Sequence, residues 1–105
     1  MNNICLYQHI YHLVKQIPPG QVVSYGTLAR KVGTTPRVVG FALAALPERS
    51  DVPWQRVINS QGRVSGRKDS DRATLQQTLL EAEGVCFNAS GRVISMLLGT
   101  DGAQL

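Results

Sequence analysis

The sequence predicts a small domain that is mainly α-helical with small β elements. Apolar residues recur at spacings of three and four in separate segments, and Pro, Gly and helix-capping residues bound those segments. Short Val and Ile runs next to turn residues predict the β elements. The 105 residues suffice for one modest core. We therefore expect a single domain over residues 1–105, with a frayed tail at about 99–105.

The first expected helix spans residues 3 to about 16. A single apolar stripe runs along it and continues to the residue that follows, formed by Ile4, Tyr7, Ile10, Tyr11, Val14 and Ile17. The Pro-Pro-Gly sequence at 18–20 cannot continue a helix and ends it.

Two further helices are expected on either side of a short turn. Ser24 is suited to cap the first of them, and Gly33 is suited to end it. Thr35 is suited to cap the next, with Pro36 at the first helical position, where its missing N–H costs nothing. Two helices joined by a short turn that contains Gly make a helix-turn-helix candidate, although many small helical domains share this pattern.

The third helix, which we expect to end at about residue 46, has an unusual outer face. Its core stripe consists of Val39, Ala42, Leu43 and Leu46. The opposite face consists of Arg37, Gly40, Phe41 and Ala44, whereas solvated faces usually carry several charged residues. Glycine within a helix costs about 1 kcal/mol relative to alanine, so something must approach Gly40 closely. A DNA minor groove and a packed neighbouring helix both explain this, and the sequence leaves both open.

Short β elements should lie between the helices and after the last of them. Residues 22–23 form an extended piece, and residues 57–58 and 63–65 flank an Asn-Ser-Gln-Gly turn, which predicts a wing-like hairpin. Residues 85–87 and 92–96 should pair across a second turn at 88–91.

The last helix should begin within residues 69–71, where Asp and Ser are suited to cap it. Its predicted inward residues are Leu75, Leu79 and Ala82, and Gly84 should end it.

The positive charge of the chain is concentrated in its middle. The net charge is +4, and residues 24–72 hold nine Lys or Arg against four acidic residues. This segment suits a nucleic acid backbone, and a solvated basic surface remains the alternative. No apolar run approaches the ~20 residues that span a bilayer, and no signal peptide is evident. We therefore expect a cytoplasmic protein, associated with the nucleoid if bacterial.

The cysteines and histidines give no sign of a metal or cofactor site. Cys5 and Cys86 form no CxxC pair and are expected to be unpaired thiols, with a disulfide unsupported by any pattern. His9 and His12 can share a helix face but lack the further ligands that zinc requires. We expect no metal, no cofactor and a monomer.

Four motifs of this chain match one known family in order and near its spacing. They are Ile17, Pro18, Gly20, Val22 or Val23, Ser24, Tyr25, Gly26, Leu28 and Ala29; Arg37, Val39 and Gly40; Pro-Trp-Gln-Arg-Val at 53–57; and Glu83 with Gly84. The chain thereby resembles the C-terminal, DNA-binding domain of O6-alkylguanine-DNA alkyltransferases over about residues 7 to 84. The resemblance implies a winged helix-turn-helix fold.

Two departures from the family pattern decide the implied activity. Trp54 replaces the acceptor cysteine of the Pro-Cys-His-Arg-Val motif, and Gln55 replaces its histidine. Alkyl transfer needs a thiolate and a base that generates it, and neither an indole nor an amide supplies these. Glu83 keeps the place of the acidic third member, for which we expect a structural hydrogen-bonding role. Tryptophan at this position marks the alkyltransferase-like proteins, so the resemblance implies a protein that is not an enzyme.

The resemblance also implies how DNA is held. The expected DNA-binding residues are Tyr25, Arg37, Gly40, Phe41 and Ala44, with the third helix in the minor groove and the target nucleotide flipped out. Tyr25 would press on the phosphate 3′ of the target, and Arg37 would fill the vacated stack. The residues alone leave alternatives open, namely a core tyrosine and a solvated arginine.

The lesion pocket implied by the resemblance consists of Tyr25, Trp54, Val57, Ser65 and Arg67. Trp54 would form a wall, Arg67 would lie over the lesion, Ser65 would bond near O6, and backbone groups at Trp54 and Val57 would read the guanine edge. Core filling by Trp54 and a surface role for Arg67 remain the alternatives.

The resemblance therefore implies that binding, without a chemical reaction, is the function of this protein. The implied function is recognition of O6-alkylguanine in double-stranded DNA, which flags the lesion for nucleotide excision repair proteins without alkyl transfer. The alternatives are a winged-helix transcription regulator that binds duplex DNA without flipping, and an active alkyltransferase that uses Cys5 or Cys86.

Overall fold

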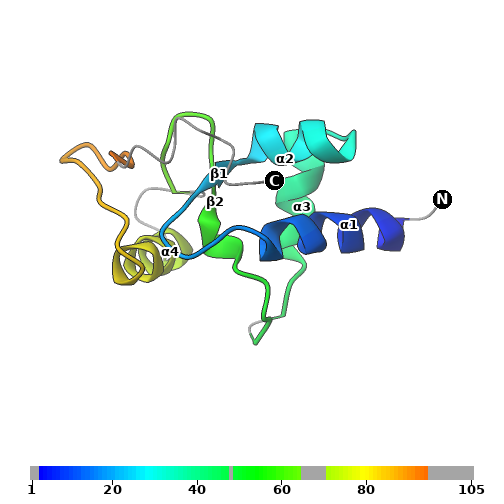
Figure 1. Cartoon of the computed structure of the whole chain (residues 1–105), viewed down its shortest axis with the longest axis horizontal. Coiled ribbons are helices and arrows are strands. Elements are labelled where there is room, and N and C mark those ends of the chain that lie inside the picture. The colour runs from blue at the N-terminus through cyan, green and yellow to red at the C-terminus, as the bar shows by residue number, and fades with distance from the viewer. Residues whose placement is uncertain (1–2, 48, 65–70, 95–105) are drawn as a thin grey trace.

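The computed structural model describes residues 3–47, 49–64 and 71–94 and is mostly helical with a small sheet (Figure 1). This confirms the predicted fold class. The elements are α1 (Asn3–Lys15), β1 (Val23–Ser24), α2 (Tyr25–Val32), α3 (Pro36–Ala44), the 3-10 turn η1 (Trp54–Arg56), β2 (Val57–Ile58) and α4 (Asp71–Ala82). The predicted tail at 99–105 lies outside the described residues. None of the helices in the described ranges has the length and apolar character needed to cross a membrane.

Helix α1 packs its predicted stripe against α2 and α3. Ile10 and Val14 are fully buried, and Ile17 is buried where the chain leaves the helix. The hydroxyl of Tyr11 donates a hydrogen bond to the Ala42 carbonyl of α3. Burial, together with the neighbouring Tyr7, raises the pKa of Tyr11 above its usual value. The tyrosine therefore stays neutral and holds α1 to α3.

The predicted helix-turn-helix is confirmed: it consists of α2 and α3, and the predicted residues cap both helices. The Ser24 and Thr35 hydroxyls each accept a hydrogen bond from the backbone N–H three residues on. Gly33 adopts a left-handed conformation with φ of 85°, which L side chains rarely adopt, and this ends α2. Pro36 begins α3, which ends at Ala44, two residues before the predicted end.

The two strands form a parallel pair in which Val23 lies opposite Val57 and Ser24 opposite Ile58. Among the described residues, 57–58 do not pair with 63–64 across the predicted turn, and Ser65 lies outside them. The physical reason is burial: Val57 and Ile58 are both fully buried, so the strand needs a partner inside the fold. Strand β1 supplies that partner.

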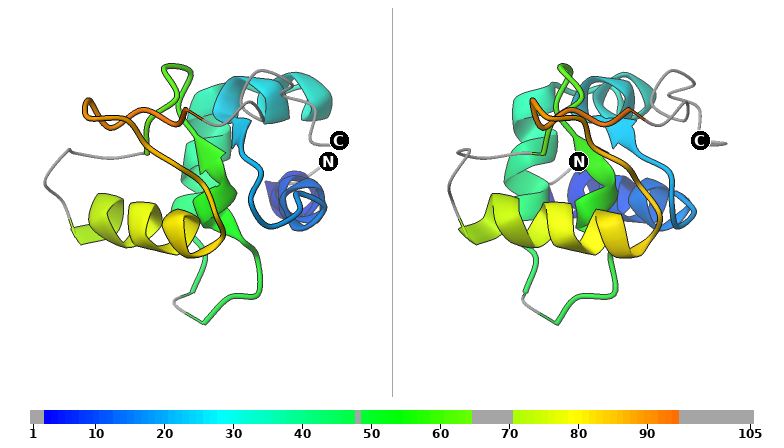
Figure 2. Two further views of the ribbon diagram at one scale, coloured as in Figure 1. Left: turned by 60° about the vertical axis from the view of Figure 1, so that its left-hand side comes forward. Right: turned by 90° about the vertical axis from the view of Figure 1, so that its left-hand side faces the viewer.

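The strand pair separates two apolar clusters, because neighbouring strand residues point to opposite faces. Figure 2 shows β1 and β2 between α4 on one side and the group of α1, α2 and α3 on the other. Val23 and Val57 belong to the cluster with the three helices. Val22 and Ile58 belong to a smaller cluster with Leu80 of α4 and the segment after it. The strands thus join the helix-turn-helix to the C-terminal part of the described chain.

Helix α4 buries a different face from the predicted one. The buried residues are Ala73, Gln76 and Leu80, whereas Leu75 is half exposed. Correspondingly, Leu79 is only partly buried and Ala82 is exposed. The Gln76 amide explains why this face is buried. Its Nε2 donates to two backbone carbonyls in the η1–β2 segment, at 2.8 and 3.1 Å. The end of α4 near Gly84 is as predicted.

The segment after α4 turns back on itself as predicted, within the described range. Phe87 and Val93 form an antiparallel bridge, and the Asn88 N–H donates to the Arg92 carbonyl at 2.8 Å. The turn at 59–63 has a similar bond, from the Asn59 N–H to the carbonyl four residues on. Both turns close locally and expose their polar tips.

Candidate nucleic-acid interface

Helix α3 exposes the face that the sequence singled out. Arg37, Phe41 and Ala44 are exposed and Gly40 is partly so, while Val39, Ala42 and Leu43 on the opposite side are buried. The Arg37 Cζ lies 5.5 Å from the centroid of the Phe41 ring. Phe41 is 53% exposed, which is unusual for an aromatic side chain that serves the core. A cation and an apolar ring thus project from the second helix of the helix-turn-helix.

Gly40 is not required by packing within the described part of the chain. A Cβ placed on this residue meets no atom within 4 Å. The explanation that a neighbouring helix packs against Gly40 is therefore wrong for the described residues. Among the described residues, nothing fills the space above Gly40.

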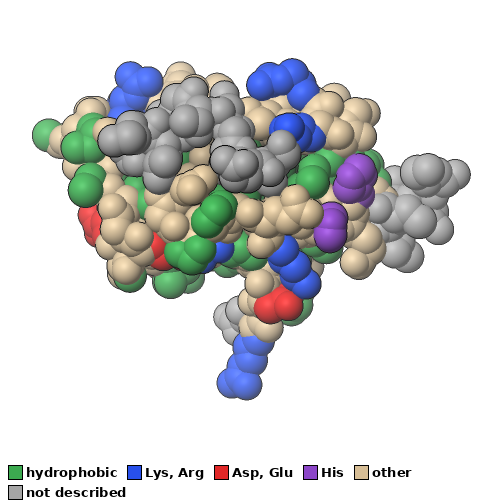
Figure 3. Space-filling view, in the orientation of Figure 1, with side chains coloured by type: hydrophobic (Ala, Val, Ile, Leu, Met, Phe, Trp, Pro, Cys, Tyr) green, Lys and Arg blue, Asp and Glu red, His purple; other side chains and the backbone are tan. Residues whose placement is uncertain are grey.

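Further exposed cations lie on the helix-turn-helix and on the loop after it. Arg30 and Lys31 in the last turn of α2, Arg37 at the start of α3 and Arg49 after α3 are all exposed. Figure 3 shows Lys and Arg side chains over α2 at the upper edge of the molecule and on the loop that projects below it. This distribution suits an extended anionic backbone.

Tyr25 stands at the entrance to the helix-turn-helix. It is the first residue of α2, directly after the capping Ser24, and its ring is partly buried against the core of the three helices. Part of the side chain remains exposed at the N-terminus of α2, where backbone N–H groups point outward and favour an anion.

A cavity opens beside Trp54. Its volume is about 260 Å³. The described residues that line it are Leu43, Leu46, Pro47, Trp54, Asp71, Arg72 and Leu75. It lies where the end of α3 and the loop after it meet the start of α4. Apart from Asp71 and Arg72, these walls are apolar or aromatic, and no described lining residue carries a thiol.

Arg72 stacks on the tryptophan in this cavity. Its Cζ lies 4.2 Å from the centroid of the Trp54 ring, within the range of a cation–π interaction. The sequence did not identify Arg72, because the resemblance to the family predicted that Arg67 is the cation over the pocket. A signal was available, because a cation in the first turn of a helix opposes the helix dipole and calls for another explanation.

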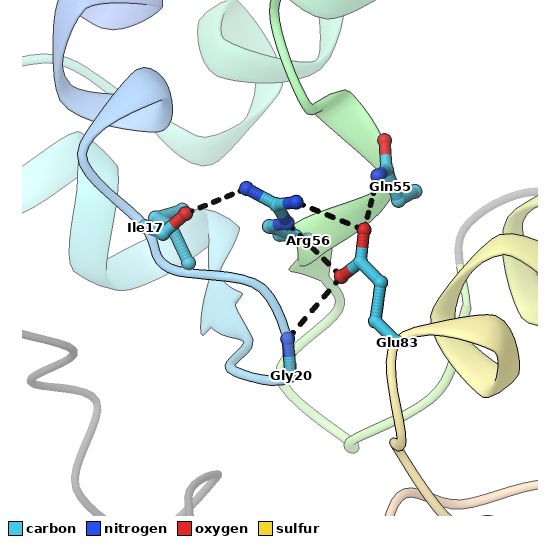
Figure 4. Close-up of polar contacts among 5 residues, drawn as sticks. All are labelled: Ile17, Gly20, Gln55, Arg56 and Glu83. Carbon is cyan, nitrogen blue, oxygen red and sulfur yellow. Dashed lines mark hydrogen bonds and ion pairs between the residues drawn. The ribbon is translucent and has the colours of Figure 1, made fainter.

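A cluster of hydrogen bonds holds the turn that carries Trp54 (Figure 4). The Arg56 guanidinium donates to both carboxylate oxygens of Glu83, at 3.0 and 2.9 Å, and to the Ile17 carbonyl at 2.8 Å. Gln55 Nε2 donates to Glu83 at 2.8 Å, and the Gly20 N–H does so at 3.3 Å. The cluster ties η1 to the segment after α1 and to the end of α4, so two distant segments hold the turn that carries Trp54.

Glu83 has the structural role that the sequence predicted. Burial opposes its ionisation, but the hydrogen bonds from Arg56, Gln55 and Gly20 and the charge of Arg56 outweigh burial and lower the pKa of this carboxyl. The Arg56 and Glu83 side chains are only 14% and 15% exposed. The carboxylate is therefore a charged, fully engaged anchor.

Trp54 of the predicted lesion pocket lines the cavity, whereas Val57 and Tyr25 are not among the described residues that line it. Val57 is fully buried in β2; its N–H donates to the Trp54 carbonyl, and its carbonyl accepts from Gln76. Its backbone is thus already bonded within the protein. Ser65 and Arg67 lie outside the described residues. Tyr25 is placed at the start of α2, away from the described cavity lining.

Comparison with known families matches residues 6–85 to the DNA-binding domain of 6-O-methylguanine DNA methyltransferase. The chain belongs to this methyltransferase DNA-binding family. Its members differ in activity. The base-flipping protein of Vibrio parahaemolyticus is 45% identical over 87 residues, covering 80% of this chain and 84% of that protein. A methylated-DNA–protein-cysteine methyltransferase of Saccharolobus islandicus is 40% identical over 76 residues, covering 72% of this chain and 48% of that enzyme.

Among the family's solved structures, Schizosaccharomyces pombe Atl1 resembles this chain in fold and length. In its complex with damaged DNA containing O6-carboxymethylguanine it is 39% identical, with a TM-score of 0.77, and the match covers 89% of this chain and 90% of that one. A methyltransferase from Mycobacterium tuberculosis is 32% identical with a TM-score of 0.61, over 73% of this chain and 47% of the enzyme. These matches confirm that this chain has the helix-turn-helix fold of its family.

Proposed function

We propose that this protein recognises O6-alkylated guanine in double-stranded DNA and does not remove the alkyl group. One observation carries the proposal: Trp54 stands where the family motif has its acceptor cysteine, and its ring lines a cavity at that position. The indole closes the site to transfer chemistry and leaves a wall against which a flat base can pack.

The neighbouring residues do not supply the missing chemistry. A nucleophilic thiolate needs a base to take its proton. Gln55 cannot accept a proton at neutral pH, and its amide is bonded to Glu83. Glu83 itself accepts four hydrogen bonds within its cluster. We therefore infer that the complex with the lesion is non-covalent.

Helix α3 is the element that we place in the minor groove. The open space above Gly40 lets the helix backbone approach the sugar-phosphate walls of a groove about 6 Å wide. Arg37, at the exposed start of α3, then reaches into the base stack, where its planar guanidinium replaces the flipped nucleotide. Tyr25 supports the backbone next to the target nucleotide.

Selectivity for the lesion follows from the cost of flipping. Alkylation at O6 removes the N1 proton of guanine and weakens pairing with cytosine, so extruding the base costs less than the usual few kcal/mol. The apolar walls formed by Leu43, Leu46 and Pro47 favour an alkyl group over bulk water.

The names of the relatives support this proposal. Two proteins at least 40% identical to this chain, from Vibrio parahaemolyticus and Escherichia coli, are called DNA base-flipping proteins. Schizosaccharomyces pombe Atl1, which shares the fold, has been solved with damaged DNA. We extend both properties to this chain.

We further propose that the protein acts as a monomer on DNA in the cytoplasm, at the nucleoid if bacterial. We also propose that its complex with the lesion is the signal that nucleotide excision repair proteins recognise. Co-purification of such repair proteins on lesion duplex, with the protein and not without it, is the expected result. Equal recovery of the repair proteins in the absence of this protein contradicts the proposal that it recruits them.

Competition binding tests the central claim. Fluorescence anisotropy with a labelled O6-methylguanine duplex, competed by the same duplex with guanine, should show a preference of at least about tenfold for the lesion, or about 1.4 kcal/mol. Equal affinity for the two duplexes contradicts lesion recognition and favours a transcription regulator that reads intact DNA.

A labelling experiment tests the absence of transfer. Incubation with DNA that carries a radiolabelled O6-methyl group should leave the protein unlabelled. Cys86, which is exposed on the segment after α4 and does not line the Trp54 cavity, is the alternative acceptor in the described structure. Label that disappears in Cys86→Ser or Cys5→Ser would overturn the non-enzymatic proposal.

A further inference from the structure

The stack of Arg72 on Trp54 points to a preference among adducts. We propose that Arg72 is a specificity-determining residue that makes the cavity favour O6-alkyl groups ending in a negative charge, such as a carboxylate. The inference rests on the proposed function, since the alkylated base must enter the cavity beside Trp54 for Arg72 to act on it.

The position of Arg72 is not explained by the stability of its helix. It is the second residue of α4, where the helix dipole disfavours a cation. In the described part of the chain, the ion pairs are Lys15–Asp51 and Arg56–Glu83, and no described residue accepts a hydrogen bond from the Arg72 guanidinium. Its contact is the face of the Trp54 ring. The N–H groups at the edge of the guanidinium are thus available to a ligand.

The geometry suits a carboxylate. A guanidinium is planar, so one face can stack on an aromatic ring while its edge donates paired hydrogen bonds in the fork that matches a carboxylate. Arg72 lies 4.2 Å from the Trp54 ring centroid and lines the same cavity, so its donors are close to an adduct bound there. A neutral methyl group needs only the apolar walls and gains nothing from this edge.

A second charged residue lines the same cavity, and both charges are exposed to solvent. Asp71 is the acidic residue that also lines it, at the first position of α4, where the helix dipole favours it. A carboxylate adduct would meet attraction from Arg72 and repulsion from Asp71, so the two residues should change its affinity in opposite directions.

The test compares adducts and variants by fluorescence anisotropy. Three duplexes differ only at one base: guanine, O6-methylguanine and O6-carboxymethylguanine. Arg72→Gln should weaken binding of the carboxymethyl duplex about tenfold and change binding of the methyl duplex less than threefold, because a hydrogen bond to a charged group is lost in one case only. Asp71→Asn should tighten binding of the carboxymethyl duplex. Arg49→Gln, which removes an exposed charge outside the cavity, should leave the ratio of the two affinities unchanged.

The outcomes separate this inference from the proposed function. If the wild-type protein prefers both adducts over guanine and Arg72→Gln weakens both equally, Arg72 is a general phosphate contact and the inference is overturned alone. If the wild type prefers neither adduct, the proposed function fails and the inference fails with it. The emission of Trp54, the single tryptophan, gives a readout without DNA. It should change in free Arg72→Gln, and unchanged emission would contradict the stack.

Discussion

Gln55 donates a hydrogen bond from Nε2 to Oε2 of Glu83 over 2.8 Å. In the family motif this position is a histidine next to the acceptor cysteine. The carboxylate that would orient such a histidine is therefore present and in reach. On the proposed function the site lacks a base and a thiol, and restoring each of them tests its effect separately.

Restoring the cysteine alone should give little alkyl transfer. A thiol with the usual pKa of about 8.5 is only a few per cent thiolate at neutral pH, and Gln55 cannot remove its proton. The double change Trp54→Cys with Gln55→His places a base on Glu83, and base catalysis contributes roughly 10² to 10⁴ in rate. We expect the double variant to take up radiolabelled methyl groups at least about 100-fold faster than Trp54→Cys.

The single Gln55→His variant is the control, since it retains Trp54 and should take up no label. Equal rates for Trp54→Cys with and without the histidine would show that the residue at position 55 is irrelevant to activation.

Glu83 should contribute strongly to stability. Glu83→Gln keeps the size of the side chain but leaves the largely buried Arg56 guanidinium without a counter-charge. The expected loss in free energy of unfolding is about 2 kcal/mol, or roughly 10 °C in Tm for a domain of this size. Asp51→Asn breaks the exposed pair with Lys15 and should change stability by less than about 0.5 kcal/mol. Similar losses in the two variants would contradict an anchoring role for Glu83.

The contribution of Glu83 should depend on pH with a definite sign. Folding lowers its pKa below the ordinary value of 4.5, so the charged form is favoured in the folded state. The stabilisation is complete above that ordinary value and is lost as the pH falls through the lowered pKa. The Tm difference between wild type and Glu83→Gln should therefore stay constant from about pH 7 to pH 6 and shrink below pH 4.5. A difference that grows on acidification would contradict this assignment.

The helix-turn-helix could be predicted because its signals are local. A cap at Ser24 or Thr35 bonds to an N–H three residues away, and a left-handed Gly33 ends a helix through its own conformation. Such features depend on neighbours in the sequence, so the residues themselves specify them. The exposed face of α3 could be predicted for the same reason.

The strand pairing and the buried face of α4 could not be predicted, because distant residues decide them. Strand β2 pairs with β1, 34 residues earlier at Val23 and Val57, rather than with the segment beyond its own turn. Gln76 turns inward although it is polar, since two carbonyls about twenty residues away accept its hydrogen bonds. Apolar periodicity alone predicts that Leu75 and Leu79 are the buried residues of this helix.

The candidate site was predicted in part. The Trp54 position followed from a short motif, and the structure places it at a cavity. Arg72 was not identified, because its stacking partner is 18 positions away and no local pattern links the two. The network around Arg56 and Glu83 likewise joins segments that the sequence keeps apart.

Arg37 and Tyr25 should both be needed for binding. Arg37→Ala removes the group that we place in the base stack, and Tyr25→Ala removes the support of the backbone beside it. We expect each to weaken binding of an O6-methylguanine duplex about tenfold or more. Arg37→Lys should not restore it, because an ammonium cannot stack. Wild-type affinity in both alanine variants would contradict the flipping mechanism.

Gly40→Ala should separate the stability of the protein from its binding. In the free protein an added Cβ meets nothing within 4 Å, and alanine favours a helix over glycine by about 1 kcal/mol. The variant should therefore unfold at a higher temperature than the wild type. In the complex the same methyl group would project into the contact between α3 and the groove wall, so affinity for both intact and damaged duplexes should fall.

A thermal melt and an anisotropy titration of the same Gly40→Ala sample measure the two effects. Opposite signs are the result expected of a glycine that is kept for close approach by DNA. Higher stability with unchanged affinity would remove α3 from the minor groove, because nothing else among the described residues accounts for a glycine at this exposed position of the helix.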